Sequence, residues 1–126
     1  MLIRKVLLVD DDTDIRTIGQ ICLSGVGGWE TVLAANGEEA LRLAASERPD
    51  VVLLDVMMPG MDGPSVLARL RADPLTAAIP VVFLTANMHR ADLGHYLALG
   101  ARGAIPKPFD PMRLPNEVRR ILEREP

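Results

Sequence analysis

Five short apolar runs, separated by longer segments with helical spacing, constrain the fold of this 126-residue chain more than any other feature. Residues 6–9, 51–54 and 81–84 are apolar at every position, and weaker runs occupy residues 31–34 and 103–105. Strands that are continuously apolar are covered on both faces, which is typical of parallel sheets flanked by helices. The runs therefore predict five strands of one parallel sheet.

The segments between the runs have the spacing of helices that cover such a sheet. Apolar residues recur every three or four positions, as in the stripe Leu114, Val118 and Ile121 of the last segment. Asp62 is predicted to cap one helix, and Asp110, followed by a proline, is predicted to open the last helix. Strict alternation of strand and helix predicts a doubly wound α/β fold, a single domain over residues 1–126 with no output domain in this chain.

Composition and charge exclude several classes of function. A net charge of -3 and an isoelectric point near 5.3 argue against a nucleic-acid surface, which would be basic. No apolar stretch has the length of a signal peptide or a membrane span. Cys22 is the only cysteine, so no intrachain disulfide can form, and its apolar neighbours predict a buried thiol. We expect a cytoplasmic protein that contacts neither nucleic acid nor membrane directly.

Polar residues stand where the predicted strands end. The first run leads into Asp10 and Asp11, the third into Asp55, the fourth into Thr85 and the fifth into Lys107. Because parallel strands end at one edge of a sheet, we expect these side chains to converge there, where open α/β sheets bind ligands.

The residue types predict the chemistry of that edge. Crowded carboxylates either acquire raised pKa values or bind a cation, and a set of oxygen ligands suits Mg²⁺ or Mn²⁺. The hydroxyl of Thr85 and the ammonium of Lys107 are suited to the oxygens of a phosphoryl group. The pattern predicts phosphoryl transfer to or from an aspartate. Asp12 and Asp14, in contrast, are interpreted as capping residues of the first helix.

Four motifs resemble the signatures of the response-regulator receiver family, in the family's order and over essentially the whole chain. They are VLLVDD at residues 6–11, DVMMPGMDG at 55–63, LTA at 84–86 and KPF at 107–109. The resemblance implies a flavodoxin-like sheet with strand order 2-1-3-4-5. It also implies a phosphoacceptor signalling domain that is not an enzyme, apart from catalysing its own phosphorylation and slow dephosphorylation. Its partner would be a sensor histidine kinase or a histidine phosphotransfer protein.

The resemblance assigns a role to each matching position. Asp55 would be the phosphoacceptor, Asp11 and Asp55 would bind Mg²⁺ (or Mn²⁺), and Asp10 would act directly or through water. The backbone carbonyl of Met57 would be a further metal ligand.

Two further positions would bind the phosphoryl group itself. Thr85 would bond one of its oxygens, and Lys107 would pair with its charge. The Lys107–Pro108 bond corresponds to the family's cis peptide. A phosphorylation-dependent dimer is compatible with the resemblance, and the downstream target is left open.

The chain departs from the family pattern near Lys107. Ala104 stands where the family commonly has an aromatic residue that moves inward on phosphorylation, and Pro106 removes a backbone donor beside the lysine. We therefore hypothesise that phosphorylation is read out through residues 88–95 or 57–61. Met57 and Asn87 flank the expected path of the hydrolytic water, and a bulky Met57 predicts slow self-dephosphorylation.

Two interpretations of other features stay open. Met57, Met58 and Met61 form either an adaptable partner surface or simply the family's loop pattern. The chain is also compatible with an interaction module that works without phosphorylation, for which Ala104 is the main support.

An aspartate-nucleophile phosphohydrolase is the less favoured enzyme alternative. It would use Asp10 and Asp12, but the position four residues after the nucleophile is Asp14, where such enzymes have Thr or Val.

Overall fold

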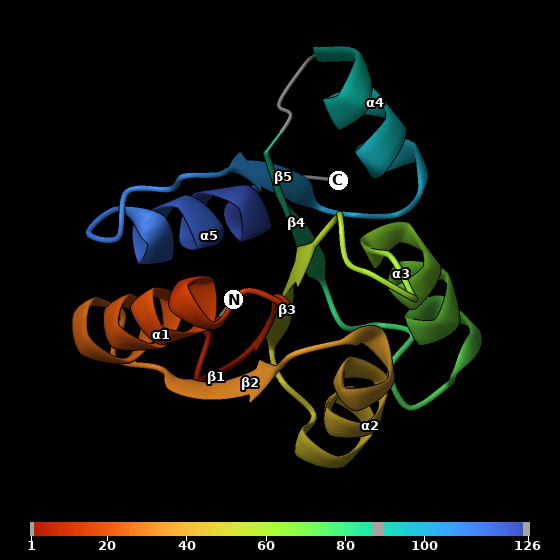
Figure 1. The fold of residues 1–126 in the computed structure, drawn as a ribbon, viewed down its shortest axis with the longest axis horizontal. Coiled ribbons are helices and arrows are strands. Elements are labelled where there is room, and N and C mark those ends of the chain that lie inside the picture. The colour runs from red at the N-terminus through yellow and green to blue at the C-terminus, as the bar shows by residue number, and fades with distance from the viewer. Residues whose placement is uncertain (1, 87–89, 125–126) are drawn as a thin grey trace.

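A five-stranded parallel sheet forms the centre of the computed structural model, which describes residues 2–86 and 90–124 (Figure 1). The strand order is β2-β1-β3-β4-β5, as the resemblance implied. The strands are β1 (Lys5–Val9), β2 (Glu30–Ala34), β3 (Val51–Asp55), β4 (Val81–Thr85) and β5 (Gly103–Pro106).

Helices cover both faces of the sheet, so the predicted doubly wound architecture is confirmed. Figure 1 shows α1 (Thr13–Ile21) and α5 (Leu114–Glu123) together on one side. The helices α2 (Gly37–Glu47), α3 (Gly63–Ala72) and α4 (Arg90–Ala98) cover the other side. A π-helical segment, η1 (Cys22–Val26), continues α1, and its Cys22 is buried as predicted. None of the described helices is long and apolar enough to cross a membrane.

The core is divided by the sheet into two apolar layers. Leu53 packs in the layer under α1 and α5, with Leu8 and Val118, whereas its neighbour Leu54 packs in the layer under α2, α3 and α4. Every residue of β3 and β4 is buried, because successive side chains point to opposite faces and both faces are covered. The continuous apolar runs of the sequence therefore mark the strands at the centre of the sheet.

Aspartate side chains were predicted to begin α3 and α5, and the structure confirms only the first of these caps. The carboxylate of Asp62 accepts a hydrogen bond of 2.9 Å from Ser65 N, so the predicted cap of α3 is confirmed. The prediction that Asp110 opens the last helix is wrong, because α5 begins at Leu114. Asp110 Oδ1 instead accepts from Met112 N at 3.0 Å, and the Asp110 carbonyl accepts from Leu114 N at 3.0 Å, so Asp110 closes a turn that leads into the helix.

Gly63 lets the start of α3 approach β3 closely. A Cβ at this position would lie 2.6 Å from the carbonyl oxygen of Asp55 and 2.9 Å from Val56 Cα, and both atoms belong to the backbone. Only a residue without a side chain fits there. The chain can therefore turn from Asp55 through residues 57–62 and return into a helix beside the same strand.

We expect Gly63→Ala to lower the free energy of unfolding by about 1–3 kcal/mol, because the methyl group must push backbone atoms apart. Gly94→Ala is the matched control, since a Cβ at Gly94 meets nothing within 4 Å inside α4. There the loss of glycine should stabilise the helix by up to about 1 kcal/mol. Urea unfolding measures both variants, and equal effects at the two positions would contradict the steric account.

Candidate phosphoacceptor site

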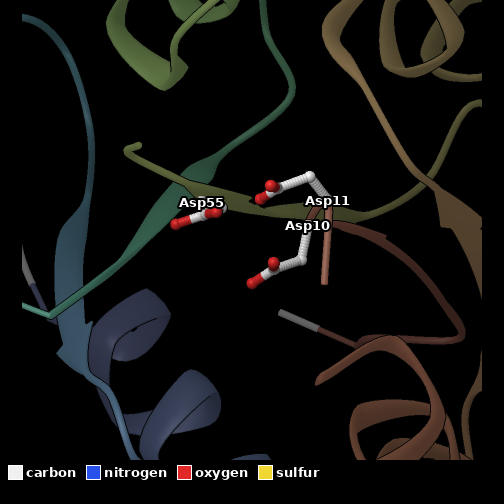
Figure 2. A group of neighbouring side chains, drawn as sticks. All are labelled: Asp10, Asp11 and Asp55. Carbon is white, nitrogen blue, oxygen red and sulfur yellow. The ribbon is translucent and has the colours of Figure 1, made fainter. Parts of the chain in front are cut away.

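The predicted polar residues meet at the carboxyl edge of the sheet. Asp10 follows the end of β1, Asp55 and Thr85 are the last residues of β3 and β4, and Lys107 follows β5. Figure 2 shows the carboxylates of Asp10, Asp11 and Asp55 gathered in one space, although they come from two strand ends. Asp10 is fully buried and Asp55 is 3% exposed, so both carboxylates are removed from bulk water.

The ammonium of Lys107 joins the two buried carboxylates. Its Nζ lies 2.8 Å from Asp10 Oδ2 and 3.1 Å from Asp55 Oδ1. The backbone also places this lysine, because Lys107 N donates to the carbonyl oxygen of Thr85 at 2.8 Å. Pro106 pairs with Thr85 in the register of β5, an edge strand in which a missing donor is tolerated. The Lys107–Pro108 peptide is cis, as the resemblance implied.

Burial and like charge set the electrostatics of Asp55. Burial of its carboxyl group, together with the negative charge of Asp10 and a hydrogen bond with Asp11, raises the pKa of Asp55 to about 6, although Lys107 opposes the shift. Burial also acts on Lys107 and disfavours its charged form. Its bonds to Asp10 and Asp55 outweigh that effect and leave the pKa of Lys107 raised. At neutral pH the site therefore holds an ionised acceptor beside a permanent ammonium.

The donor set fits a hard divalent cation. One oxygen each from Asp10, Asp11 and Asp55 can be chosen so that all lie within 4.8 Å of one another. Lys107 neutralises only one of the three carboxylate charges, and Asp11 is exposed, so water can complete a coordination shell. All-oxygen ligands with access to water are what Mg²⁺ and Mn²⁺ prefer. The role of the Met57 carbonyl stays a prediction.

Asp12 lies next to this cluster in sequence but has a different role. Its carboxylate accepts from Asp14 N at 2.8 Å and caps α1, which confirms Asp12 as the cap of this helix. In addition, Asp12 N donates to Asp10 Oδ1 at 2.9 Å. A phosphohydrolase would need the Asp12 carboxylate at the reacting atoms, whereas here it is engaged at the helix terminus.

The methionines of the loop after β3 do not form a shared surface. Met57 is 76% exposed, but Met58 is buried in the core. Met61 packs against Gly37 at the start of α2, where its sulfur leaves no room for a Cβ. The adaptable surface considered from the sequence is therefore wrong for Met58, whereas Met61 is half-buried against the core.

One charged residue that the sequence did not single out also touches the site. Arg16 Nη1 donates to the backbone carbonyl of Asp10 at 2.7 Å. The sequence could have indicated this contact, because Arg16 lies one helical turn after the cap Asp12. From that position a long side chain can reach back to the end of the preceding strand. Asn87, Met88 and His89, to which parts of the sequence hypotheses refer, lie outside the described residues.

With this geometry in view, comparison with known proteins defines the class. The family model for the response regulator receiver domain matches residues 6–119. The chain therefore belongs to the response-regulator receiver family and is a receiver domain of two-component signalling.

Relatives and solved structures agree with that class. The chain is 44% identical over 120 residues to the probable transcriptional regulator ycf27 of Guillardia theta, which covers 95% of this chain and 46% of that protein. It is 40% identical over 121 residues to the alkaline phosphatase synthesis transcriptional regulatory protein PhoP of Bacillus subtilis, covering 96% and 49%. The chain thus spans about half the length of these relatives. The structure of chemotaxis protein CheY4 of Vibrio cholerae superposes with a TM-score of 0.87 at 34% identity, covering 95% of this chain and 99% of that one.

The raised pKa of Asp55 has a measurable consequence for stability. The folded protein holds the Asp55 proton more tightly than the unfolded chain does, so its charge destabilises the metal-free fold. This cost is absent below about pH 4, grows as the pH rises towards 6 and is complete above it. We expect Asp55→Asn to raise the unfolding free energy of metal-free protein at neutral pH by on the order of 2 kcal/mol.

The advantage of Asp55→Asn should shrink towards zero when unfolding is measured near pH 4 in the presence of a chelator. Asp12→Asn is the matched control, because asparagine also caps helices and Asp12 lies outside the buried pair. A stabilisation by Asp55→Asn that does not change with pH would contradict the assignment of the raised pKa to this carboxyl group.

Proposed function

We propose that Asp55 accepts a phosphoryl group from the phosphohistidine of a sensor histidine kinase or a histidine phosphotransfer protein. The observation that carries the proposal is the position of the Lys107 ammonium, bonded to both Asp10 and Asp55 at the edge where Asp11 and Thr85 also lie. The domain would then pass the signal on by protein contacts, including a phosphorylation-dependent dimer.

The chain's own residues supply nucleophile and charge stabilisation. An ionised oxygen of Asp55 attacks the phosphorus, the new O–P bond forms as the P–N bond of phosphohistidine breaks, and the imidazole leaves. Because the pKa of Asp55 is about 6, the nucleophile is ionised at neutral pH without a separate base. Lys107 would pair with one phosphoryl oxygen and the hydroxyl of Thr85 would donate to another.

A divalent cation would complete this arrangement. Asp10, Asp11, Asp55 and the backbone carbonyl of Met57 are the groups that we propose hold Mg²⁺ or Mn²⁺. When bound, the ion neutralises charge that accumulates on the phosphoryl oxygens. Asp10 also keeps Lys107 beside the acceptor, through the 2.8 Å contact between Lys107 Nζ and Asp10 Oδ2.

Readout of the phosphorylated state must work without an aromatic residue on β5. Ala104 is buried, pairs with Phe83 of β4, and contributes to the floor of a groove between α4 and α5. The aromatic side chain near this position is Tyr96 of α4, whose ring lies 5.0 Å from that of Phe83. This contact connects α4 with the strand that carries Thr85. Because Tyr96 directly follows residues 88–95, the contact supports a readout through that segment.

Phosphorylation itself is tested with a small phosphodonor. Incubation with acetyl phosphate and Mg²⁺ should add the mass of one phosphoryl group, and peptide mapping should place it on Asp55. Asp55→Asn should abolish the modification, and Lys107→Ala should slow it by on the order of a hundredfold. Asp12→Asn should leave it unchanged. Modification of another residue, or full signalling by Asp55→Asn in cells, would favour a module that works without phosphorylation.

The lifetime of the phosphorylated state tests the role of Met57. Its side chain is exposed beside the acceptor strand, where it can obstruct an attacking water. We expect Met57→Asn to speed self-dephosphorylation severalfold, because a smaller polar group admits water. Loss of the phosphoryl group is followed by intact mass after the donor is removed. Met112→Asn, an equally apolar and exposed position in the turn before α5, should not change the rate.

A further inference from the structure

The peptide that joins Asp10 to Asp11 is held by an arginine from the following helix. Arg16 Nη1 donates to the carbonyl oxygen of Asp10 at 2.7 Å, and Arg16 Nη2 lies 3.3 Å from Thr13 Oγ1. That carbonyl belongs to the peptide unit whose nitrogen is the backbone N of Asp11. The guanidinium therefore fixes the plane from which the Asp10 and Asp11 side chains both diverge.

Further hydrogen bonds restrict the backbone of residues 10–12. Asp10 N donates to the carbonyl oxygen of Ala34 at 3.1 Å, and Asp12 N donates to Asp10 Oδ1 at 2.9 Å. Asp12 is in turn fixed as the cap of α1. The exposed residue Asp11 thus lies between two immobilised neighbours. Within the described residues, Arg16 is the one hydrogen-bond donor to the Asp10 carbonyl.

If Arg16 acted on the proposed metal site only through its positive charge, it would weaken the binding of a cation. A half-buried guanidinium bonded to the Asp10 carbonyl repels a cation that enters the site, so its removal should strengthen cation binding. An orienting effect acts the other way, because side chains held in the binding geometry lose less conformational freedom when the ion arrives. The sign of the change in affinity therefore distinguishes the two roles.

We propose that Arg16 is a positioning residue, which holds Asp11 in its metal-binding orientation through the Asp10–Asp11 peptide. The inference rests on the proposed function, since it concerns the divalent cation of the same site. Arg16 does not touch the cation or the phosphoryl group. It acts on the backbone of the residues that do.

The test compares Arg16→Ala and Arg16→Lys with Arg69→Ala, a control that removes an exposed arginine from α3. Titration of each protein with MgCl₂, followed by the amide NMR signals of residues 10–12 and 55–57, gives the dissociation constant of the metal alone. We expect Arg16→Ala to weaken Mg²⁺ binding about tenfold, as loss of an orienting partner does. Lysine keeps the charge but not the paired donors, so an intermediate loss is expected. Arg69→Ala should match wild type.

A kinetic measurement adds a readout that a merely structural role would not move. With acetyl phosphate as donor, Arg16→Ala should need about tenfold more Mg²⁺ for half-maximal phosphorylation of Asp55, and should approach the wild-type rate at saturating Mg²⁺. Thermal unfolding of the metal-free proteins is recorded in parallel. Alanine is a strong helix former, so α1 should persist in this variant.

Four outcomes would overturn the inference. Stronger Mg²⁺ binding by Arg16→Ala would show that the guanidinium acts only as a charge. Unchanged Mg²⁺ binding with a lower melting temperature would show that it only stabilises α1. If the wild-type protein does not bind Mg²⁺, both the proposed metal site and the inference are wrong. If the wild-type protein binds Mg²⁺ and the Arg16 variants bind it with the same dissociation constant, only the inference is wrong.

Discussion

The contact of the Lys107 ammonium with Asp10 and Asp55 is the interaction on which the site depends. Two carboxylates that are almost fully buried would repel each other, and one ammonium within 3.1 Å of both compensates part of that cost. The compensation is incomplete, as the raised pKa of Asp55 indicates. The remaining negative charge is what makes a divalent cation a favourable addition to this edge of the sheet.

The surrounding fold keeps that unfavourable arrangement in place. Apolar strands buried on both faces end at the same edge, so the acidic residues cannot separate without breaking the sheet. The loop after Asp55 is held where it enters α3, by the close backbone contact at Gly63 and by the Asp62 carboxylate that caps the helix. Burial of the two apolar layers thus stabilises the fold enough to offset the cost of the buried carboxylates. Proteins commonly accept such a destabilising site for the sake of function.

Local patterns predicted most of the fold, and the errors have identifiable causes. Continuous apolar runs marked β3 and β4, and Asp62 marked the start of α3. At Asp110 the same local signal failed, because an aspartate followed by proline can close a turn that precedes a helix as readily as it can cap the helix itself. Met58 and Met61 were ambiguous for a similar reason, since sequence does not show which methionines of an irregular loop face the core.

The class of site could be predicted from the sequence, because the alternation of strands and helices shows which residues stand at the strand ends. The sequence places five polar residues at one edge of the sheet, since parallel strands all end on the same side: Asp10, Asp11, Asp55, Thr85 and Lys107. The contacts among them became clear only in three dimensions: Lys107 bonds both buried aspartates, Asp12 caps α1, and Arg16 donates to the Asp10 carbonyl. The positions of the strand ends follow from patterns repeated along the chain, whereas the direction of each side chain depends on packing between segments that are distant in sequence.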